Sequence, residues 1–212
     1  MKQKFRLSLS GLSLVLLTMT FSSNTFAQND LQYAGVSSKK MNYTASTQNN
    51  TQWCWAASIQ MVLRYYGVYV SQEQIVERTF GVKRNGQLPN LTASPEIITA
   101  NLNKWGVDNR GQKYRVQAVW GQNAPAPNVL LREMKANRPL IIGYEGEQGG
   151  HAVVVTAVGY TDSRRGPAIE EIVVRDPWPS KRNRRRKGRI VYDGLDLANR
   201  IGDYWIIRVY KY

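Results

Sequence analysis

The stretch Gln48–Ser58 reads Q-N-N-T-Q-W-C-W-A-A-S and contains Cys54, the only cysteine in the chain. A polar, turn-forming run ends at Trp53, and a pattern compatible with a helix begins at the cysteine itself. The first turn of a helix has unpaired backbone N–H groups and the positive end of the helix dipole, which together stabilise an anion. This placement favours a thiolate nucleophile, and the rest of the sequence is weighed against that hypothesis.

The residues after the cysteine predict a central helix over residues 54–66, ended by Gly67. Its apolar side chains occupy two adjoining stripes of one helical face. The stripes consist of Trp55, Ile59, Val62 and Tyr66, and of Cys54, Ser58, Met61 and Tyr65. A face this wide indicates a helix that is buried along most of its length.

The remaining elements follow an order of helices first and strands afterwards. Ser71 and Gln74 form a capping-box pattern, and Ser94 with Pro95 marks another helix start. Helices are predicted at 72–80, 95–105 and 128–137, and strands at 114–120, 140–144, 151–160, 169–175, 189–192 and 203–209. This order predicts an α+β fold in which an N-terminal helical lobe packs on a C-terminal antiparallel sheet, with a cleft between them.

The first 27 residues have the pattern of a secretory signal peptide. Basic residues precede an apolar run at 7–21, and small residues at 25–27 suit a cleavage site. We therefore expect a secreted or periplasmic protein. No later segment is apolar over the length of a membrane span, so the mature chain is expected to have no transmembrane segment.

The mature chain is expected to form one domain. Residues 28–47 are polar and predict an extended lead-in without secondary structure, followed by a single domain over residues 48–212. The lead-in is too short for a folded inhibitory segment. We expect the product to be a monomer.

The chain carries a formal net charge of +14, and its densest basic run is Lys181–Arg189, K-R-N-R-R-R-K-G-R. Such a run attracts polyanions, but it lacks the interleaved aromatic residues that stack on nucleic-acid bases, so nucleic acid is not the expected partner. Two interpretations stay open. The run contacts an anionic cell surface or lipid headgroups, or it forms an exposed hairpin tip that adds solubility.

His151 is the only histidine, and it begins a strongly apolar strand after two glycines. The next strand ends at Asp176, so an antiparallel hairpin brings this carboxylate back beside the imidazole. Acyl transfer by a thiol needs a thiolate, an imidazole that shares and returns its proton, and a group that orients the ring. Cys54, His151 and Asp176 supply this set.

Each of these residues also has a structural interpretation on its own. A lone cysteine is often a small buried hydrophobe, a lone histidine can be a satisfied core residue, and Asp176 before Pro177 can form a turn. Their joint arrangement favours catalysis. One cysteine and one histidine without metal-ligand spacing predict neither a metal nor a cofactor.

Acyl transfer also needs donors for the oxyanion of the tetrahedral intermediate. The N–H of Cys54 is one candidate. A side-chain amide from the preceding loop is another, and both Gln48 and Gln52 qualify on chemistry alone.

The chain resembles the papain-like cysteine peptidases, in particular a bacterial branch with a W-C-W-A-A signature that is related to bacteriocin-leader peptidases. In the family, the oxyanion glutamine stands six residues before the cysteine, and this spacing carries over to Gln48. A tryptophan follows the cysteine, as Trp55 does here. The family's C-G-S-C-W pattern of plant and animal enzymes is absent.

The second half of the resemblance concerns the residues around His151 and Asp176. The family histidine begins a strand after a glycine or small residue, as His151 does after Gly149 and Gly150. Its third member is Asn or Asp with a tryptophan two residues later, which matches Asp176 and Trp178. The resemblance thus assigns catalytic roles to Cys54, His151, Asp176 and Gln48.

The resemblance implies an exported thiol peptidase that cleaves a peptide or protein through an acyl-enzyme. We expect substrate contacts from Trp55, Gly149, Gly150 and Trp178, and we expect Trp178 to shield the histidine–aspartate pair from water. Glu145 and Glu147 precede His151 and suggest a preference for basic peptides. The alternatives are an acyl transferase or cell-wall amidase with the same residues, or a basic adaptor without catalysis.

Overall fold

The computed structural model of the chain describes residues 30–146 and 149–212. The predicted signal peptide, residues 1–27, lies outside the described residues, and so does Glu147. Among the residues that are described, no helix is long and apolar enough to cross a membrane.

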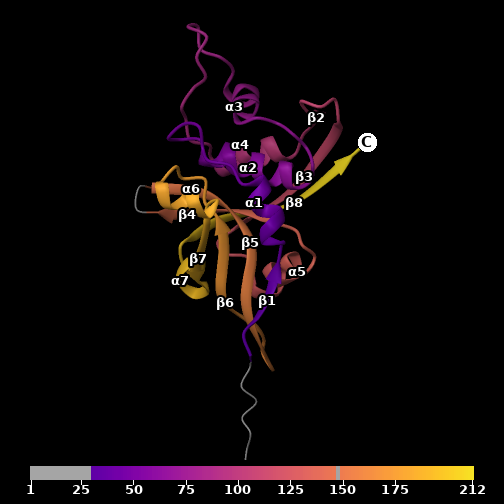
Figure 1. The fold of residues 1–212 in the computed structure, drawn as a ribbon, viewed down its shortest axis with the longest axis vertical. Helices are drawn as coiled ribbons and strands as arrows, with labels where there is room; N and C mark the ends of the chain where they lie inside the picture. The colour runs from indigo at the N-terminus through magenta and orange to yellow at the C-terminus, as the bar shows by residue number, and fades with distance from the viewer. Residues whose placement is uncertain (1–29, 147–148) are drawn as a thin grey trace, which may run out of the picture.

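One antiparallel sheet organises the fold (Figure 1). Its strand order is β2-β3-β8-β4-β5-β6-β7, and β1 pairs with β5 outside this path. The strands are β1 (Gln32–Gly35), β2 (Trp105–Val107), β3 (Lys113–Gln122), β4 (Leu140–Gly146), β5 (Gly149–Ser163), β6 (Gly166–Arg175), β7 (Arg189–Asp193) and β8 (Ile201–Lys211).

Seven helices occur in the described parts of the chain. They are α1 (Ser38–Thr44), α2 (Cys54–Tyr65), α3 (Gln72–Phe80), α4 (Pro95–Leu102), α5 (Pro127–Lys135), α6 (Lys181–Arg186) and α7 (Gly194–Ala198). In Figure 1, α2, α3 and α4 gather at the top, while β5, β6 and β7 extend below them. The expected α+β fold is confirmed.

The sheet is buried on both faces, which explains its long apolar runs. Ile141, Val154 and Trp205 belong to the core that contains α2. Ile142 and Val153 belong to a second core that contains α5 residues. Because neighbouring residues of a strand point to opposite faces, the two cores lie on opposite sides of the sheet.

The helix that begins at Cys54, α2, is buried along almost its whole length, as its wide apolar face predicted. Ser58, one turn after Cys54, is fully buried and donates a hydrogen bond to the carbonyl of Ala152 at 3.0 Å. Ala152 directly follows His151 in β5. This bond therefore fixes the start of α2 against the start of β5.

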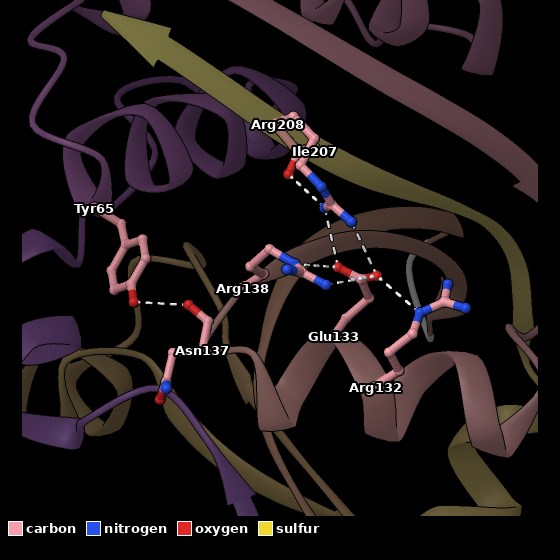
Figure 2. A network of polar contacts seen from close by, with 7 residues as sticks. All are labelled: Tyr65, Arg132, Glu133, Asn137, Arg138, Ile207 and Arg208. Carbon is pink, nitrogen blue, oxygen red and sulfur yellow. Dashed lines mark hydrogen bonds and ion pairs between the residues drawn. The ribbon is translucent and has the colours of Figure 1, made fainter.

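A polar network supports the other end of α2 (Figure 2). Tyr65 donates to the carbonyl of Asn137 at 2.8 Å, in the turn after α5. Next to this turn, Glu133 of α5 is 1% exposed and pairs with Arg138 at 2.7 Å and Arg208 of β8 at 3.0 Å. The network joins α5 and β8 close to the last turn of α2.

The structure corrects three expectations. The described part of 28–47 is not an extended lead-in, because β1 pairs with β5 and α1 packs on α2 through the buried Met41. The helix predicted to reach residue 105 ends at Leu102, since residues 105–107 pair with β3. The basic run is not a hairpin tip: most of it is helix α6.

Candidate active site

Cys54 is the first residue of α2, as expected, and it forms no disulfide. The two flanking tryptophans are buried and anchor the loop that precedes α4. Trp53 donates its indole N–H to the carbonyl of Pro89 at 3.0 Å, and Trp55 donates to the carbonyl of Leu91 at 3.2 Å. These bonds hold the helix start and the neighbouring loop in one arrangement.

His151 and Asp176 are in direct contact, with 2.8 Å between Nε2 and Oδ1. β5 carries the imidazole, and the carboxylate follows the last residue of the paired strand β6. The side chains are 16% and 10% exposed. With Nε2 bonded to Asp176, Nδ1 is the ring nitrogen left for a second partner.

The pKa values of this pair move apart. Burial alone favours the neutral ring, but the hydrogen bond and charge of Asp176, together with the interaction with Cys54, raise the pKa of His151 to about 9. Burial opposes ionisation of Asp176 as well, yet the hydrogen bond and charge of His151 hold the pKa of this carboxyl below its ordinary value. At neutral pH the pair is an imidazolium and a carboxylate.

Hydrogen bonds from the loop after Asp176 and from the basic run hold Asp176 in position. Trp178 donates its backbone N–H to Oδ1 at 2.8 Å, and the buried Asn183 of α6 donates its side-chain amide to the carbonyl of Trp178 at 3.2 Å. The N–H of Asp176 donates to the carbonyl of Gly188, which has a φ of +71°. A Cβ at residue 188 would stand 2.4 Å from the Asp176 carbonyl oxygen, so glycine is needed there.

Gln48 is buried beside this loop, and its backbone N–H donates to the carbonyl of Pro177 at 2.9 Å. Its side-chain amide donates to the carbonyls of Asn50 and Thr51, both at 2.9 Å. Its Oε1 is buried without a partner among the described residues. By contrast, Gln52 is exposed, so of the two glutamines Gln48 is the better candidate for the second oxyanion donor.

A cavity of about 290 Å³ opens beside the cysteine. It lies where the helical part of the chain meets β4, β5 and β8, which agrees with the expected cleft. Its lining residues are Cys54, Trp55, Thr92, Ala93, Pro95, Ile98, Gly143, Tyr144, Glu145, Gly150, His151, Ala152, Gly202, Asp203 and Trp205.

The residues expected to contact substrate are divided between two places. Trp55, Gly150 and Glu145 line this cavity, and Gly149 does not. Trp178 lines a separate cavity of about 150 Å³ next to Asp176, and its ring centroid lies 6.5 Å from that of His151. Trp178 thus covers the histidine–aspartate pair from one side.

Asp203 is a charged lining residue that was not predicted from the sequence. It lies on β8, and it reaches the site because β8 pairs with β4. A single carboxylate at the start of a predicted strand gives no local signal of this kind.

A fold of this type, with a cysteine opening a buried helix and a histidine–aspartate pair on the facing sheet, defines a papain-like cysteine peptidase. The chain belongs to the Peptidase_C39-like family, whose sequence model matches residues 40–205. It is accordingly a cysteine peptidase with a peptide substrate. No curated protein sequence matches the chain closely enough to count as a relative.

Several solved structures are similar to this chain, and the first two below share its fold. A procathepsin B from Trypanosoma congolense is 14% identical with a TM-score of 0.54, and the match covers 84% of this chain and 77% of that one. A digestive procathepsin L proteinase from Tenebrio molitor is 13% identical with a TM-score of 0.51, covering 82% and 67%. The peptidase domain of Streptococcus ComA, a bifunctional ABC transporter, is 16% identical with a TM-score of 0.47, covering 78% and 97%.

Proposed function

We propose that this protein is an exported cysteine peptidase that hydrolyses peptide bonds through an acyl-enzyme on Cys54. The observation that carries the proposal is the placement of His151. Its Nε2 lies 2.8 Å from Asp176, and it lines the same cavity as Cys54. A nucleophile and a base therefore meet at one cavity, and an orienting carboxylate outside its lining holds the base.

In the acylation step, the Cys54 sulfur attacks the carbonyl carbon of the substrate and the C–N bond breaks. His151 carries the proton and delivers it to the leaving amine, so the amine departs neutral. The high pKa of His151, about 9, keeps the ring protonated and able to donate at neutral pH. Asp176 holds the ring through Nε2, which directs Nδ1 to the reacting atoms.

In the deacylation step, a water molecule attacks the thioester carbonyl. His151, now neutral, takes a proton from this water, and the sulfur leaves as a thiolate when the C–S bond breaks. The product is a carboxylic acid, and the enzyme returns to its starting protonation state.

The oxyanion of both steps needs two donors. The N–H of Cys54 is one, since the first N–H groups of a helix have no partner within it. Gln48 supplies the second. Its amide donates to the carbonyls of Asn50 and Thr51, so we propose that one of these bonds exchanges for a bond to the oxyanion.

The test is hydrolysis of casein and of a proteome-derived peptide library by the parent and by Cys54→Ala. We expect cleavage by the parent and a loss of at least about a thousandfold in the variant, without a large change in Tm. Alkylation by iodoacetamide across pH gives a second readout. A profile at Cys54 like that of a free thiol, unaltered in His151→Ala, would contradict the activated cysteine.

Export is the part of the proposal that rests on residues 1–27. The first strand, β1, begins at Gln32, so cleavage near Gln28 leaves every described element intact. Expression in a bacterium, followed by mass measurement of the released protein, is expected to give a chain that starts near Gln28. A full-length chain retained in the cytoplasm would contradict export.

We also propose that α6 brings the enzyme to anionic surfaces, because its lysine and arginine side chains are exposed. Co-sedimentation with vesicles that contain anionic lipid is expected to be lost when Arg182 and Arg185 are both replaced by Gln. Equal binding to neutral vesicles would contradict it.

A further inference from the structure

Two carboxylates lie in the wall of the cavity that contains Cys54 and His151. They are Glu145 of β4 and Asp203 of β8. Among the described residues that line the cavity there is no lysine or arginine, although the whole chain has a net charge of +14. Apart from His151, whose charge is paired with Asp176, the charged side chains of the wall are therefore acidic, on a basic protein.

Asp203 faces the cavity because it stands two residues before Trp205 on β8, and residues two apart in a strand point to the same face. The pairing of the sheet is irregular directly beside it. Asp203 pairs with Gly143, but the next residue of β4, Tyr144, pairs with Ile201, which leaves Gly202 as a bulge. Bulges redirect side chains and often stand beside active sites. Asp203 lines the cavity together with Trp205, two residues further along the same strand.

The space in front of Asp203 is kept open by glycines. A Cβ at Gly143 would lie 3.8 Å from the Asp203 Cβ and 3.7 Å from the Trp205 ring, so a larger side chain there would project into this space. A Cβ at Gly202 meets no atom of the described residues within 4 Å.

One oxygen of Asp203 is already engaged. Oδ1 accepts the indole N–H of Trp120 at 2.7 Å, and this is the side chain's one hydrogen bond within the described chain. The bond fixes the orientation of the carboxylate and leaves Oδ2 for another donor. Asp203 is half-buried, so a cation that pairs with it is partly shielded from water.

Much of the rest of the wall is apolar. Ala93, Pro95, Ile98 and Trp205 contribute to it. A lysine or arginine side chain matches this combination, because its methylene stem packs on apolar groups while its charged end pairs with a carboxylate. An apolar side chain would bury Oδ2 of Asp203 without a partner, and an acidic one would meet like charge.

We propose that the cavity is a substrate subsite for a lysine or arginine side chain, with Asp203 as its counter-ion. The proposal rests on the proposed peptidase function and adds the substrate class. Because Cys54 and His151 line the same cavity, the basic residue lies next to or near the cleaved bond. Glu145 is exposed at the rim, where water and salt screen its charge, and so contributes less.

The first experiment measures cleavage. The parent is expected to cleave a proteome-derived peptide library with lysine or arginine enriched at one position near the cut. Asp203→Asn keeps an oxygen for Trp120 and removes the charge. It is expected to lower the kcat/KM ratio of a lysine peptide over its norleucine analogue about tenfold or more.

Three variants serve as controls. Asp196→Asn, an exposed aspartate on α7, is expected to leave the ratio unchanged. Asp203→Glu retains the charge and is expected to retain part of the preference. Glu145→Gln is expected to have a smaller effect than Asp203→Asn, and an equal or larger effect would overturn the assignment to Asp203.

The second experiment separates the subsite from the chemistry. Calorimetric titration of Cys54→Ala protein with the same two peptides is expected to show tighter binding of the lysine peptide, and Asp203→Asn in this background is expected to abolish the difference. Binding preference without cleavage by the parent would leave the subsite standing and contradict the peptidase function. Equal binding of both peptides, or a cleavage ratio unaffected by Asp203→Asn, would overturn the subsite.

Discussion

Asp176 and Glu133 are two carboxylates withdrawn from solvent and paired with cations, yet their surroundings differ. Glu133 is surrounded by arginines: Arg138 and Arg208 bind it at 2.7 and 3.0 Å, and Arg132 lies 3.4 Å away (Figure 2). Asp176 has one cationic partner, His151, at 2.8 Å. Guanidinium groups stay charged at every relevant pH, whereas an imidazole titrates.

The difference separates a structural site from a reactive one. Burial raises the pKa of the Glu133 carboxyl, but hydrogen bonds from Arg138 and Arg208 outweigh this and hold the pKa below its ordinary value. Nothing in this network exchanges a proton near neutral pH. In the other pair, His151 lines the cavity that contains Cys54, so under the proposed mechanism a change at Asp176 alters the reactivity of Cys54.

Among the variants that test this comparison, the largest effect is expected from Asp176→Asn. The amide keeps an oxygen for the Trp178 N–H and loses the charge that raises the pKa of His151. We expect kcat/KM at neutral pH to fall about a hundredfold, and its alkaline limb to move from about pH 9 toward the ordinary histidine value of about 6.5. An alkaline limb that stays in place in the variant would contradict this.

Glu133→Gln should affect stability instead. Removing the charge leaves partly exposed arginines without their counter-ion, and we expect urea denaturation to show a loss of about 2 kcal/mol. The activity of the folded fraction should stay within twofold of the parent. A hundredfold loss of activity in a fully folded variant would erase the distinction between the two carboxylates.

A smaller effect is expected from Asn183→Ala. Asn183 donates a hydrogen bond to the Trp178 carbonyl and helps to lower the pKa of Asp176. Its loss should therefore reduce kcat/KM by less than about tenfold and move the acid limb of the pH–kcat/KM profile to higher pH. Arg182→Ala, an exposed neighbour on the same helix, is the matched control. An equal shift in both variants would assign the effect to the charge of α6 and not to Asn183.

A further prediction concerns the pH dependence of stability. Because the pKa of His151 is raised from 6.5 to about 9 on folding, its contribution is fully present below about pH 6.5 and is lost as pH rises through about 9. The parent's Tm should therefore fall over this window more than that of His151→Gln. Parallel curves for the two proteins would show that the imidazolium adds nothing to stability.

Local sequence patterns predicted the elements that hold the reactive residues. The apolar stripes after Cys54 gave the buried helix α2, and the capping-box pattern gave the start of α3, where both reciprocal bonds are formed. The strand pattern on both sides of the β5–β6 turn placed Asp176 beside His151. These predictions succeeded because each depends on residues that are close in sequence, or on one hairpin.

The features that escaped prediction depend on distant partners. The basic run forms a helix that is held by tertiary contacts. Its buried residue Asn183 donates to the carbonyl of Trp178, and the buried Arg175 donates to the carbonyls of Arg186 and Lys187. The charge pattern of the run does not indicate these contacts. Asp203 faces the cavity only because of how β8 pairs with β4. The catalytic roles of Cys54, His151, Asp176 and Gln48 stay predictions until the variants are measured.

The pairing of β1 with β5 has a consequence for how the chain folds. Gln32 and Tyr160 are 128 positions apart, yet their side chains are hydrogen-bonded at 2.8 Å across the two strands. Contacts of this span form slowly, since a long loop must close before they stabilise anything. Of the described strands, β1 leaves the ribosome first, and it must therefore wait for β5, a strand in the last third of the chain. This delay agrees with the proposed export, in which the chain would cross a membrane before it folds.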